Sequence, residues 1–348
     1  MTAKGDESMK KSASVREALL YEPMGGGRVR CGLCERRCVI PLGEKGFCQT
    51  RANCEGRLYT LVYGDVSALE ARPIEIKPFF HFFPGSRALT FATWSCNFTC
   101  PWCQNWHLSR GKPSTEKARY ISAEQMVEMA KAQTNQGLCA SFQEPTVLFE
   151  YCLDVFRLGK KQGLYGSYVS NGYLTIDALR MLAAAGMDAM NIDIKGDEEV
   201  YHVYLSGARE EVIWRNAQAA QEMGVHVEMI HLLVTGLNDD EEKIKRVIAK
   251  HLDMLGPDTP LHFTRYFPAY EYDQPPTDLE VMTFAYKTAK RAGLHYPYLG
   301  NISGHHFENT YCPSCGTLLI ERAGYYVRPC FLTGRSCPHC GRGIAVVM

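Results

Sequence analysis

The sequence has no long hydrophobic run and no excess of charge of either sign. No apolar stretch approaches the ~20 residues that a membrane-spanning helix needs, and the first 20 residues are polar, without the apolar centre of a signal peptide. Basic and acidic residues number 38 each, so the chain lacks the one-signed surface typical of proteins that bind nucleic acid or anionic lipid. We therefore expect a cytoplasmic protein that binds neither nucleic acid nor membrane.

Cysteine, in contrast, is abundant, with 15 residues in a chain of 348. Several of these cysteines cluster in Cys-x₂-Cys units, which in a chain without a signal peptide favour metal binding over a disulfide framework. Two other cysteines, Cys139 and Cys152, fall in an expected strand and an expected helix, where buried structural thiols are common. The length suffices for one large domain with small appendages.

The most informative cysteines follow a strand-like run at residues 87–93. Cys96, Cys100 and Cys103 occupy one short turn, and three thiolates so placed can hold three corners of a [4Fe–4S] cluster while the fourth iron stays open. A closed electron-transfer cluster would need a fourth cysteine nearby, and none follows before Cys139. The alternative is a Cys₃His zinc site completed by His107.

From about residue 87 to 300, strand-like runs alternate with amphipathic helical segments. The expected strands are 87–93, 138–142, 166–170, 189–194, 225–234 and 261–267. The expected helices are 122–137, 151–161, 176–185, 212–223, 238–255 and 277–291, with starts capped by Ser122, Asn238 and Thr277. This alternation predicts an α/β fold with parallel strands. A partial (β/α)6 TIM-like barrel fits at least as well as an open sheet, and either places the chemistry at the carboxyl ends of the strands.

We expect four regions along the chain. Residues 1–25 are predicted to be a disordered leader and 26–75 an N-terminal Cys-rich metal-binding segment. The barrel is expected at 76–300, and a C-terminal zinc-ribbon or rubredoxin-like domain at 301–348.

Polar residues follow three of the strands at their carboxyl ends. They are Gln143 and Glu144, Ser170 and Asn171, and Asp193 and Lys195. Alternation along a strand puts Asp193 and Lys195 on the same side. Each pair also has an ordinary structural interpretation: a carboxylate at a helix N-terminus, an Asn-Gly turn and a structural salt bridge.

The last two strands carry further polar and aromatic residues. His226, Glu228 and His231 lie on one strand, and His262 and Arg265 on the next; we expect them only to line the pocket. Three tyrosines, Tyr266, Tyr270 and Tyr272, either shape a substrate entrance or belong to the core and rim.

Two more cysteine groups flank the barrel. The tail group is Cys312, Cys315, Cys337 and Cys340, in two Cys-Pro-x-Cys-Gly turns typical of a zinc ribbon or rubredoxin, so zinc or iron is expected there. Without metal this short tail has too little core to fold. The front group is Cys31, Cys34, Cys38 and Cys48, with zinc or an auxiliary iron–sulfur cluster as its ligand. Cys54 competes with Cys48 as the fourth ligand, and Cys330 is expected to be a spare thiol.

These motifs together resemble the radical SAM superfamily, in particular its pyruvate formate-lyase activating enzyme-like members of the AmmeMemoRadiSam type. The resemblance includes the Cys-x₃-Cys-x₂-Cys turn with Trp102 before its third cysteine, the front and tail cysteine groups, and the Gln-Glu-Pro, Ser-Asn-Gly and Asp-Ile-Lys segments. The chain departs from the family in having Gln143 where asparagine is common, an extra Cys330, and long appendages that compact glycyl-radical activases lack.

The resemblance implies reductive cleavage of S-adenosylmethionine (SAM) at the [4Fe–4S] cluster to a 5′-deoxyadenosyl radical, which abstracts hydrogen from a substrate. It further implies SAM contacts from Trp102, Gln143, Glu144, Ser170, Asn171, Asp193 and Lys195, and reduced flavodoxin or ferredoxin as electron donor. The substrate stays open, with a protein glycine, another protein residue, a small molecule and a lipid as candidates. Two functions of other classes also stay open: a non-catalytic zinc-ribbon adaptor and an iron–sulfur electron carrier.

Overall fold

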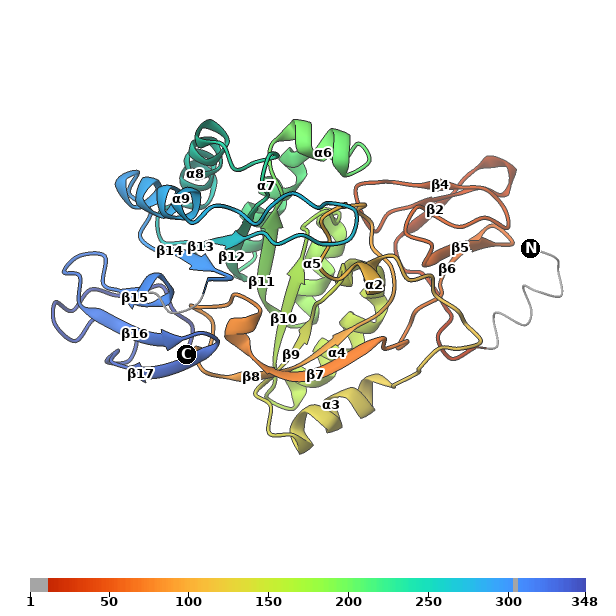
Figure 1. Cartoon of the computed structure of the whole chain (residues 1–348). Coiled ribbons are helices and arrows are strands. Elements are labelled where there is room, and N and C mark those ends of the chain that lie inside the picture. The colour runs from red at the N-terminus through yellow and green to blue at the C-terminus, as the bar shows by residue number, and fades with distance from the viewer. Residues whose placement is uncertain (1–11, 303–305) are drawn as a thin grey trace. The chain divides into compact units, whose positions relative to one another are not determined.

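The computed structural model describes residues 12–302 and 306–348, and the chain divides into two compact units (Figure 1). Unit 1 comprises the residues up to Ala71 together with Ala88–Asp188. Unit 2 comprises Arg72–Arg87 and Ala189–Met348. Each unit is described by itself.

Unit 1 begins with two small antiparallel sheets. One contains β2 (Tyr21–Pro23), β3 (Val29–Cys31) and β4 (Val39–Ile40) in that order, and the 3-10 turn η1 (Gly25–Gly27) joins β2 to β3. The other contains β1 (Arg16–Glu17), β6 (Arg57–Thr60) and β5 (Arg51–Cys54). Glu55 and Gly56, with φ of 54° and 77°, form the two-residue turn between β5 and β6 that right-handed strand twist favours.

The disordered leader expected at 1–25 is therefore wrong for the part that the structure describes. Residues 1–11 lie outside the described residues, but β1 and β2 fall within 12–25 and pair with β6 and β3. Their short polar sequences gave no periodic signal, because the ladder partners that order them lie farther along the chain.

The remainder of unit 1 is a parallel α/β arrangement. Strands β10 (Tyr165–Ser170), β9 (Gly137–Ala140), β8 (Arg87–Ala92) and β7 (Ala68–Pro73) are neighbours in that order, and β8, β9 and β10 are parallel. The helices between them are α2 (Trp106–Ser109), α3 (Ala123–Ala132), α4 (Phe149–Lys161) and α5 (Ile176–Ala185). The 3-10 helix η3 (Pro145–Leu148) precedes α4, and α4 packs against β9 and β10 (Figure 1).

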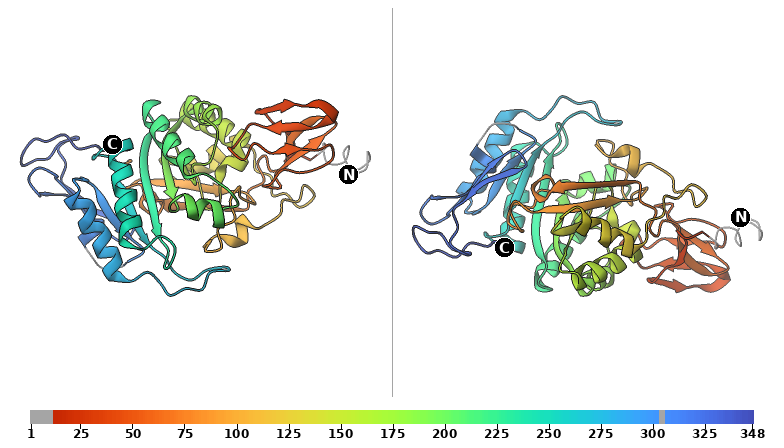
Figure 2. Two further views of the ribbon diagram at one scale, coloured as in Figure 1. Left: turned by 90° about the horizontal axis from the view of Figure 1, so that it is seen from above. Right: turned by 90° about the horizontal axis from the view of Figure 1, so that it is seen from below.

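Unit 2 repeats the same alternation. Its parallel strands are β11 (Met187–Ile194), β12 (His226–Leu233), β13 (Leu261–Arg265) and β14 (Pro297–Gly300). Its helices are α6 (Glu198–Tyr204), α7 (Glu210–Glu222), α8 (Glu241–Leu255) and α9 (Leu279–Arg291), and α8 and α9 lie side by side (Figure 2). A 3-10 turn, η2 (Ile74–Ile76), belongs to its first segment.

The tail of unit 2 forms a small antiparallel sheet of its own. It contains β15 (Thr310–Tyr311), β16 (Leu318–Ala323) and β17 (Tyr326–Cys330), after the 3-10 turn η4 (His306–Glu308). Its buried side chains include Leu319, Ile320, Ile344 and Val346. Cys312 and Cys337 belong to the same buried cluster, which also includes Phe80, Tyr296 and Tyr298 of unit 2.

The parallel α/β fold predicted from the alternating pattern is confirmed, and all six expected strands are present. Several helix ends differ from the expected bounds; α4 and α7, for example, begin at Phe149 and Glu210, two residues earlier than expected. Ser122 and Gln125 do form a capping box at the start of α3, but α3 ends at Ala132, since Gly137 already belongs to β9. The caps of α8 and α9 are Asp240 and Asp278, not Asn238 and Thr277.

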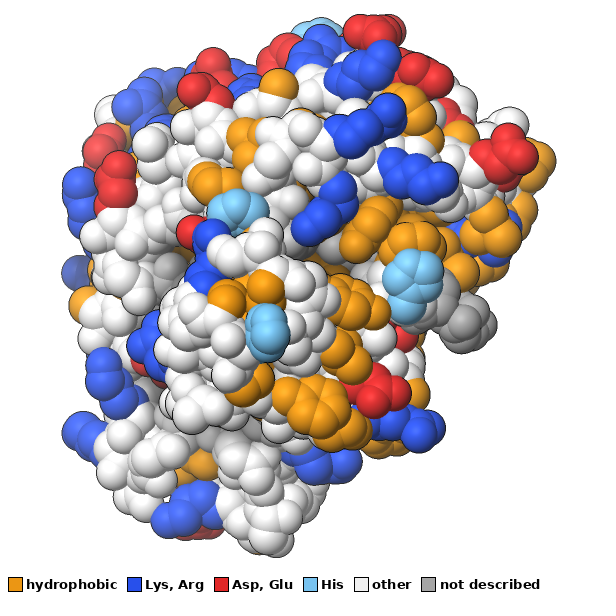
Figure 3. Space-filling view, turned by 90° about the vertical axis from the view of Figure 1, so that its left-hand side faces the viewer, with side chains coloured by type: hydrophobic (Ala, Val, Ile, Leu, Met, Phe, Trp, Pro, Cys, Tyr) orange, Lys and Arg blue, Asp and Glu red, His pale blue; other side chains and the backbone are white. Residues whose placement is uncertain are grey.

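The surface matches the balanced composition. On the face shown in Figure 3, basic and acidic side chains both occur, together with patches of hydrophobic side chains. Of the helices in the described residues, none has the length and apolar character needed to cross a membrane.

Candidate active site

In unit 1, the loop between β8 and α2 presents the three cysteines of the predicted cluster site. Cys100 is buried, while Cys96 and Cys103 are partly exposed. The Phe98 amide donates to the Cys96 sulfur at 3.3 Å, and the Cys103 sulfur lies 3.2 Å from the Ser109 hydroxyl in α2. All three thiols therefore belong to one loop that is built of short turns.

The loop thiols differ in spacing from the tail cysteines. Within residues 12–302 and 306–348, one group of His, Cys, Asp or Glu has three or more ligand atoms all within 4.8 Å of one another, and it lies in the tail. Zinc–sulfur bonds of about 2.3 Å place tetrahedral sulfurs about 3.8 Å apart, whereas thiolates on different irons of a cubane lie farther apart. Cys96, Cys100, Cys103 and His107 are not gathered in this way among the described residues, which is compatible with cubane corners.

Two strained residues hold the site loops. Ser95, before Cys96, and Phe142, before Gln143, each have φ of 75°, which costs a non-glycine residue about 1–3 kcal/mol. The Asn105 amide in the cysteine loop donates to the Phe142 carbonyl at 2.6 Å, which ties this loop to the end of β9. Neither strained residue is a glycine, so the sequence contained no signal for them.

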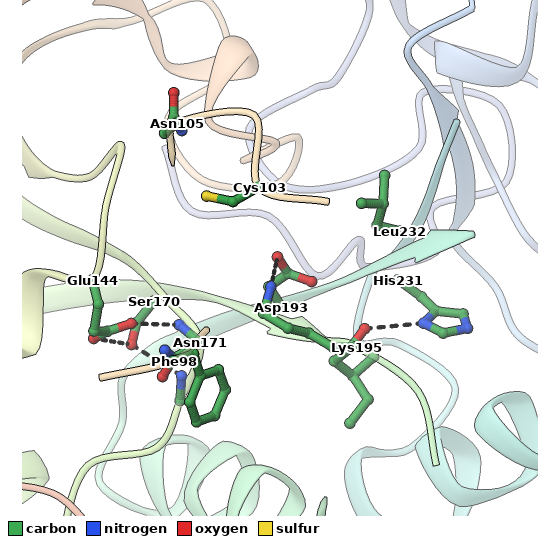
Figure 4. Close-up of polar contacts among 12 residues, drawn as sticks. Phe98, Cys103, Asn105, Glu144, Ser170, Asn171, Asp193, Lys195, His231 and Leu232 are labelled. Atoms are coloured by element: carbon green, nitrogen blue, oxygen red, sulfur yellow. Dashed lines mark hydrogen bonds and ion pairs between the residues drawn. The ribbon is translucent and has the colours of Figure 1, made fainter. Parts of the chain in front are cut away.

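The Glu144 carboxylate organises the ends of β9 and β10. It is 2% exposed and accepts hydrogen bonds from the Thr146 amide at 3.0 Å, the Ser170 hydroxyl at 2.8 Å and the Asn171 amide at 2.8 Å (Figure 4). Burial raises the pKa of Glu144, and these donors oppose the rise. Glu144 thus also has the structural role considered from the sequence, because it caps η3.

Asn171 links this network to the cysteine loop. Its side-chain amide donates to the Asn97 carbonyl oxygen Oδ1 at 2.7 Å and lies 4.0 Å from the Cys96 sulfur. Gly172, with φ of 72°, makes the turn that follows. Residues from three separate segments therefore meet beside one cluster ligand.

A test of whether these residues suit a bound ligand comes from polar atoms that lack partners. Both Oε1 and Nε2 of Gln143 are buried and have no hydrogen-bond partner among the described residues, and the same holds for Nδ2 of Asn97. Leaving such groups unpaired costs about 1–3 kcal/mol each. A ligand with donors and acceptors, such as an amino acid's amino and carboxylate groups, would satisfy them, so the site fits SAM. Trp102 is 3% exposed and packs in this loop.

In unit 2, Asp193 and Lys195 form an ion pair of 2.7 Å at the end of β11. Their pairing shows that they lie on one side of the strand, while Ile192 and Ile194 are fully buried. Asp193 Oδ1 has no partner in the described part of the chain, so one carboxylate oxygen is left for another donor. The Asn238 amide donates to the Lys195 carbonyl at 2.8 Å.

The buried charges of β12 form a satisfied network. Glu228 is fully buried and accepts from His226 at 3.0 Å, from His262 at 2.7 Å, and from the amides of Phe80 and His81 at 3.0 and 2.7 Å. Burial would raise the pKa of Glu228, but the hydrogen bonds from the two histidines outweigh it and lower the pKa. These residues hold the 77–85 segment of unit 2 in place. The sequence did not predict this role, because the partners of Glu228 in that segment are backbone amides, which leave no pattern in a sequence.

The other residues expected to line the pocket are divided between core and surface. His231 is fully buried and donates through Nδ1 to the Ile194 carbonyl at 3.0 Å (Figure 4), and burial lowers its pKa. Tyr266 is fully buried and its hydroxyl donates to the Tyr272 carbonyl at 2.7 Å. Tyr270 is exposed, and Arg265 donates to the Thr277 carbonyl at 2.7 Å.

In the N-terminal part of unit 1, Cys31, Cys34, Cys38 and Cys48 line one cavity. The cavity contains about 370 Å³ free of protein atoms, part of it open to solvent. Cys54 does not line it; this thiol packs instead with Val15, Ala52 and Leu61.

The four tail cysteines are gathered around a point. The sulfurs of Cys312 and Cys340 lie 3.5 Å apart, and those of Cys315 and Cys337 lie 3.6 Å apart. Hydrogen bonds from Thr317 lower the pKa of Cys315 to about 6, which favours the thiolate that binds metal. The group suits a single tetrahedral ion. Cys330, at the end of β17, is exposed and outside it.

The comparisons with known proteins agree with this geometry. Residues 93–248 match the Radical SAM superfamily. The chain is 39% identical to an uncharacterized protein of Methanocaldococcus jannaschii, over 96% of this chain and 100% of that protein. It is 24% identical to the pyruvate formate-lyase-activating enzyme of Clostridium pasteurianum, over 47% of this chain and 68% of that enzyme.

A solved structure is similar in fold. Streptococcus suis SuiB bound to its precursor peptide SuiA has a TM-score of 0.50 and 12% sequence identity, over 67% of this chain and 52% of SuiB. At this identity the likeness concerns the fold alone.

Proposed function

Because the chain belongs to the radical SAM superfamily and is an enzyme of that type, we propose that Cys96, Cys100 and Cys103 bind its [4Fe–4S] cluster and that the adjoining strand ends bind SAM. The observation that supports this most is the pair of unpartnered amide atoms of buried Gln143, beside the Glu144 network. With the cluster and SAM bound, this group supplies one-electron cleavage of the sulfonium to a 5′-deoxyadenosyl radical.

The protein residues orient the cofactor. Three thiolates leave one iron without a protein ligand, so the amino and carboxylate groups of SAM can bind there. Gln143 and the remaining acceptor capacity of Glu144 suit the ammonium. Ser170 and Asn171, which already donate to Glu144, hold that carboxylate in place. We propose Trp102, Asp193 and Lys195 as further SAM contacts, as the family motifs imply.

We further propose that the radical abstracts hydrogen from a protein glycine, with reduced flavodoxin or ferredoxin as the electron donor. The relative named pyruvate formate-lyase-activating enzyme supports this choice. The second candidate is modification of another protein residue, a small molecule or a lipid. It is favoured by the segments that precede and follow the barrel-type core in the sequence.

The test is an anaerobic assay of the full chain with dithionite and SAM. We expect 5′-deoxyadenosine from the wild type and a loss of at least about 100-fold in Cys100→Ala, because the cluster loses one of three ligands. The matched control is Cys139→Ala, a buried thiol of β9, which should stay within about twofold of wild type.

Two results would contradict the proposal. An electron carrier would reduce and reoxidise without forming 5′-deoxyadenosine, and a zinc adaptor would contain zinc and no acid-labile sulfide. Either finding in folded, metal-loaded wild-type protein would exclude radical chemistry at this loop.

A further inference from the structure

The N-terminal cysteine cavity differs from the tail site in the spacing of its sulfurs. All four tail ligand atoms lie within 4.8 Å of one another, and no three of Cys31, Cys34, Cys38 and Cys48 do so among the described residues. A single tetrahedral zinc needs sulfurs about 3.8 Å apart. The four front cysteines instead line one cavity together without such close spacing, which is the arrangement expected of thiolates on separate irons of a cluster.

The lining of this cavity suits a thiolate-bound cluster. Apolar side chains such as Ile40, Phe47 and Val147 form part of its wall, and two arginines, Arg36 and Arg51, also line it. Arg51 is 1% exposed, and its Nε has no hydrogen-bond partner in the part of the chain that is described. A buried N–H donor without a partner, next to four thiols, is suited to a cluster sulfur.

The cavity is joined directly to the loop that carries Cys96. The Ser95 hydroxyl donates to the carbonyl of Cys48 itself at 2.6 Å. Arg36 Nε donates to the Asn97 carbonyl, and Asn97 also lines the cavity. Ser95 and Asn97, which flank Cys96, are therefore both hydrogen-bonded to the segment that carries the front cysteines. All of these residues belong to unit 1.

From this spacing, lining and connection, we propose that Cys31, Cys34, Cys38 and Cys48 bind a four-cysteine [4Fe–4S] cluster that passes electrons to the radical SAM cluster. In the transfer, one electron takes the front cluster from the [4Fe–4S]⁺ to the [4Fe–4S]²⁺ state and the radical SAM cluster from [4Fe–4S]²⁺ to [4Fe–4S]⁺. No bond breaks and no proton moves. The front cluster regains its electron from the reduced flavodoxin- or ferredoxin-type donor. The electron role rests on the proposed function, whereas the binding of the cluster does not.

The first experiment removes the radical SAM cluster and asks what the front cysteines hold. The full chain with Cys96→Ala, Cys100→Ala and Cys103→Ala is reconstituted anaerobically with iron and sulfide. We expect about four acid-labile sulfides and about four irons per chain in addition to the tail metal, with the Mössbauer spectrum of a [4Fe–4S]²⁺ cluster. A folded variant that contains zinc and no sulfide would overturn the proposal.

The second experiment works in the opposite direction and needs no enzymatic activity. Replacing Cys31, Cys34, Cys38 and Cys48 by alanine should lower the sulfide content from about eight to about four per chain. Cys54→Ala, in the same segment but outside the cavity, is the matched control and should keep about eight. Loss of sulfide in the control, or retention of eight in the quadruple variant, would contradict the assignment.

Electron paramagnetic resonance tests the coupling of the two clusters. Dithionite-reduced wild-type protein should show signals broadened by the interaction of two neighbouring paramagnetic clusters, and the variant without Cys96, Cys100 and Cys103 should show a single unbroadened signal. Two non-interacting signals in the wild type would overturn the electron role. Failure of the proposed function is distinguishable, because the wild type would then form no 5′-deoxyadenosine although the front cysteines still held about four sulfides.

Discussion

The front and tail cysteine groups have four cysteines each, yet they are built in opposite ways. In the tail, two turns meet so that sulfurs of one turn lie 3.5 and 3.6 Å from sulfurs of the other. Within each turn, the Cys312 or Cys337 carbonyl accepts from the glycine amide four residues on, at 2.9 Å. At the front, the cysteines line a cavity whose walls come partly from their own segment and partly from distant residues such as Asn97 and Val147. This difference in construction is why we propose different metal cofactors for two groups with the same number of cysteines.

The difference shows how much of a metal site a sequence motif can encode. A Cys-Pro-x-Cys-Gly turn contains its own geometry, because Gly316 and Gly341, with φ of 73° and 75°, close each turn locally. The front site depends on tertiary contacts such as the Ser95–Cys48 hydrogen bond. We expect damage to the tail site to stay local and damage to the front site to spread.

The largest expected effect concerns the tail. Replacing the two exposed ligands by Cys315→Ala and Cys340→Ala should remove about one metal ion per chain, and with it the apparent ~10–16 kcal/mol that a structural zinc contributes to a small domain. Limited proteolysis should then cut within residues 306–348 and leave the rest intact, as mass spectrometry of the fragments can show.

The matched control for the tail is Cys330→Ala, which removes an exposed thiol outside the group. It should retain the metal and the protease resistance of wild type. Full metal occupancy in the double variant would show that the gathered sulfurs are not a metal site, and the comparison with the front group would then fail.

A smaller effect is expected at the wall of the front cavity. Arg51 and Glu150 form a 2.7 Å ion pair with side chains only 2% and 8% exposed. Arg51→Met leaves the Glu150 charge buried and unpaired, which should lower the free energy of unfolding by about 3–5 kcal/mol. Urea unfolding measures this change, and adding Glu150→Leu should recover most of the loss.

Its control is an ion pair of the same type on the surface. Arg180 and Asp177 are 3.3 Å apart and about two-thirds exposed, so Arg180→Met should change the free energy of unfolding by less than about 1 kcal/mol. Equal stabilities of Arg51→Met and Arg180→Met would mean that the cavity wall is not held by its buried charges.

The smallest expected effect distinguishes ligand binding from structure at the cysteine loop. Gln143→Leu removes an amide that has no protein partner, so stability without SAM should stay equal or rise. SAM affinity, measured by anaerobic calorimetry, should fall about tenfold, or ~1.4 kcal/mol, for one lost hydrogen bond. Exposed Gln133 provides the control, and Gln133→Leu should leave both quantities unchanged. Lower stability with unchanged SAM affinity would give Gln143 a structural role.

Much of the fold was predictable because hydrophobic periodicity is a local property. The six strands and the span of α5 followed from it, and Gly186, with φ of 107°, ends α5 as expected. The caps of α8 and α9 were wrong because tertiary contacts use the expected residues: Asn238 accepts from the Val234 amide at 2.6 Å and Thr277 accepts from the Tyr266 amide at 2.9 Å. The short α6 and β14 also lacked a strong pattern.

The candidate site was predictable where residues of one motif act together. Spacing alone predicted the four tail cysteines that the structure gathers, and it also predicts the three loop cysteines as cluster ligands. The contributions of Ser95, Asn97 and Arg36 were not predictable, since they depend on contacts between distant segments and on the positive φ of Ser95. The sequence likewise could not choose between Cys48 and Cys54 as the fourth cysteine of the front group, because both follow the Cys-rich turn. The structure separates them, since Cys48 lines the cavity and Cys54 does not.

The central claim is that Cys96, Cys100 and Cys103 leave one iron open for SAM. Electron–nuclear double resonance of the dithionite-reduced full chain with SAM labelled by ¹⁵N at its amino group tests this most directly. The account predicts a ¹⁵N hyperfine coupling to the reduced cluster, which disappears in Cys100→Ala and persists in Cys139→Ala. A loaded, reduced cluster with no such coupling in the wild type would contradict it.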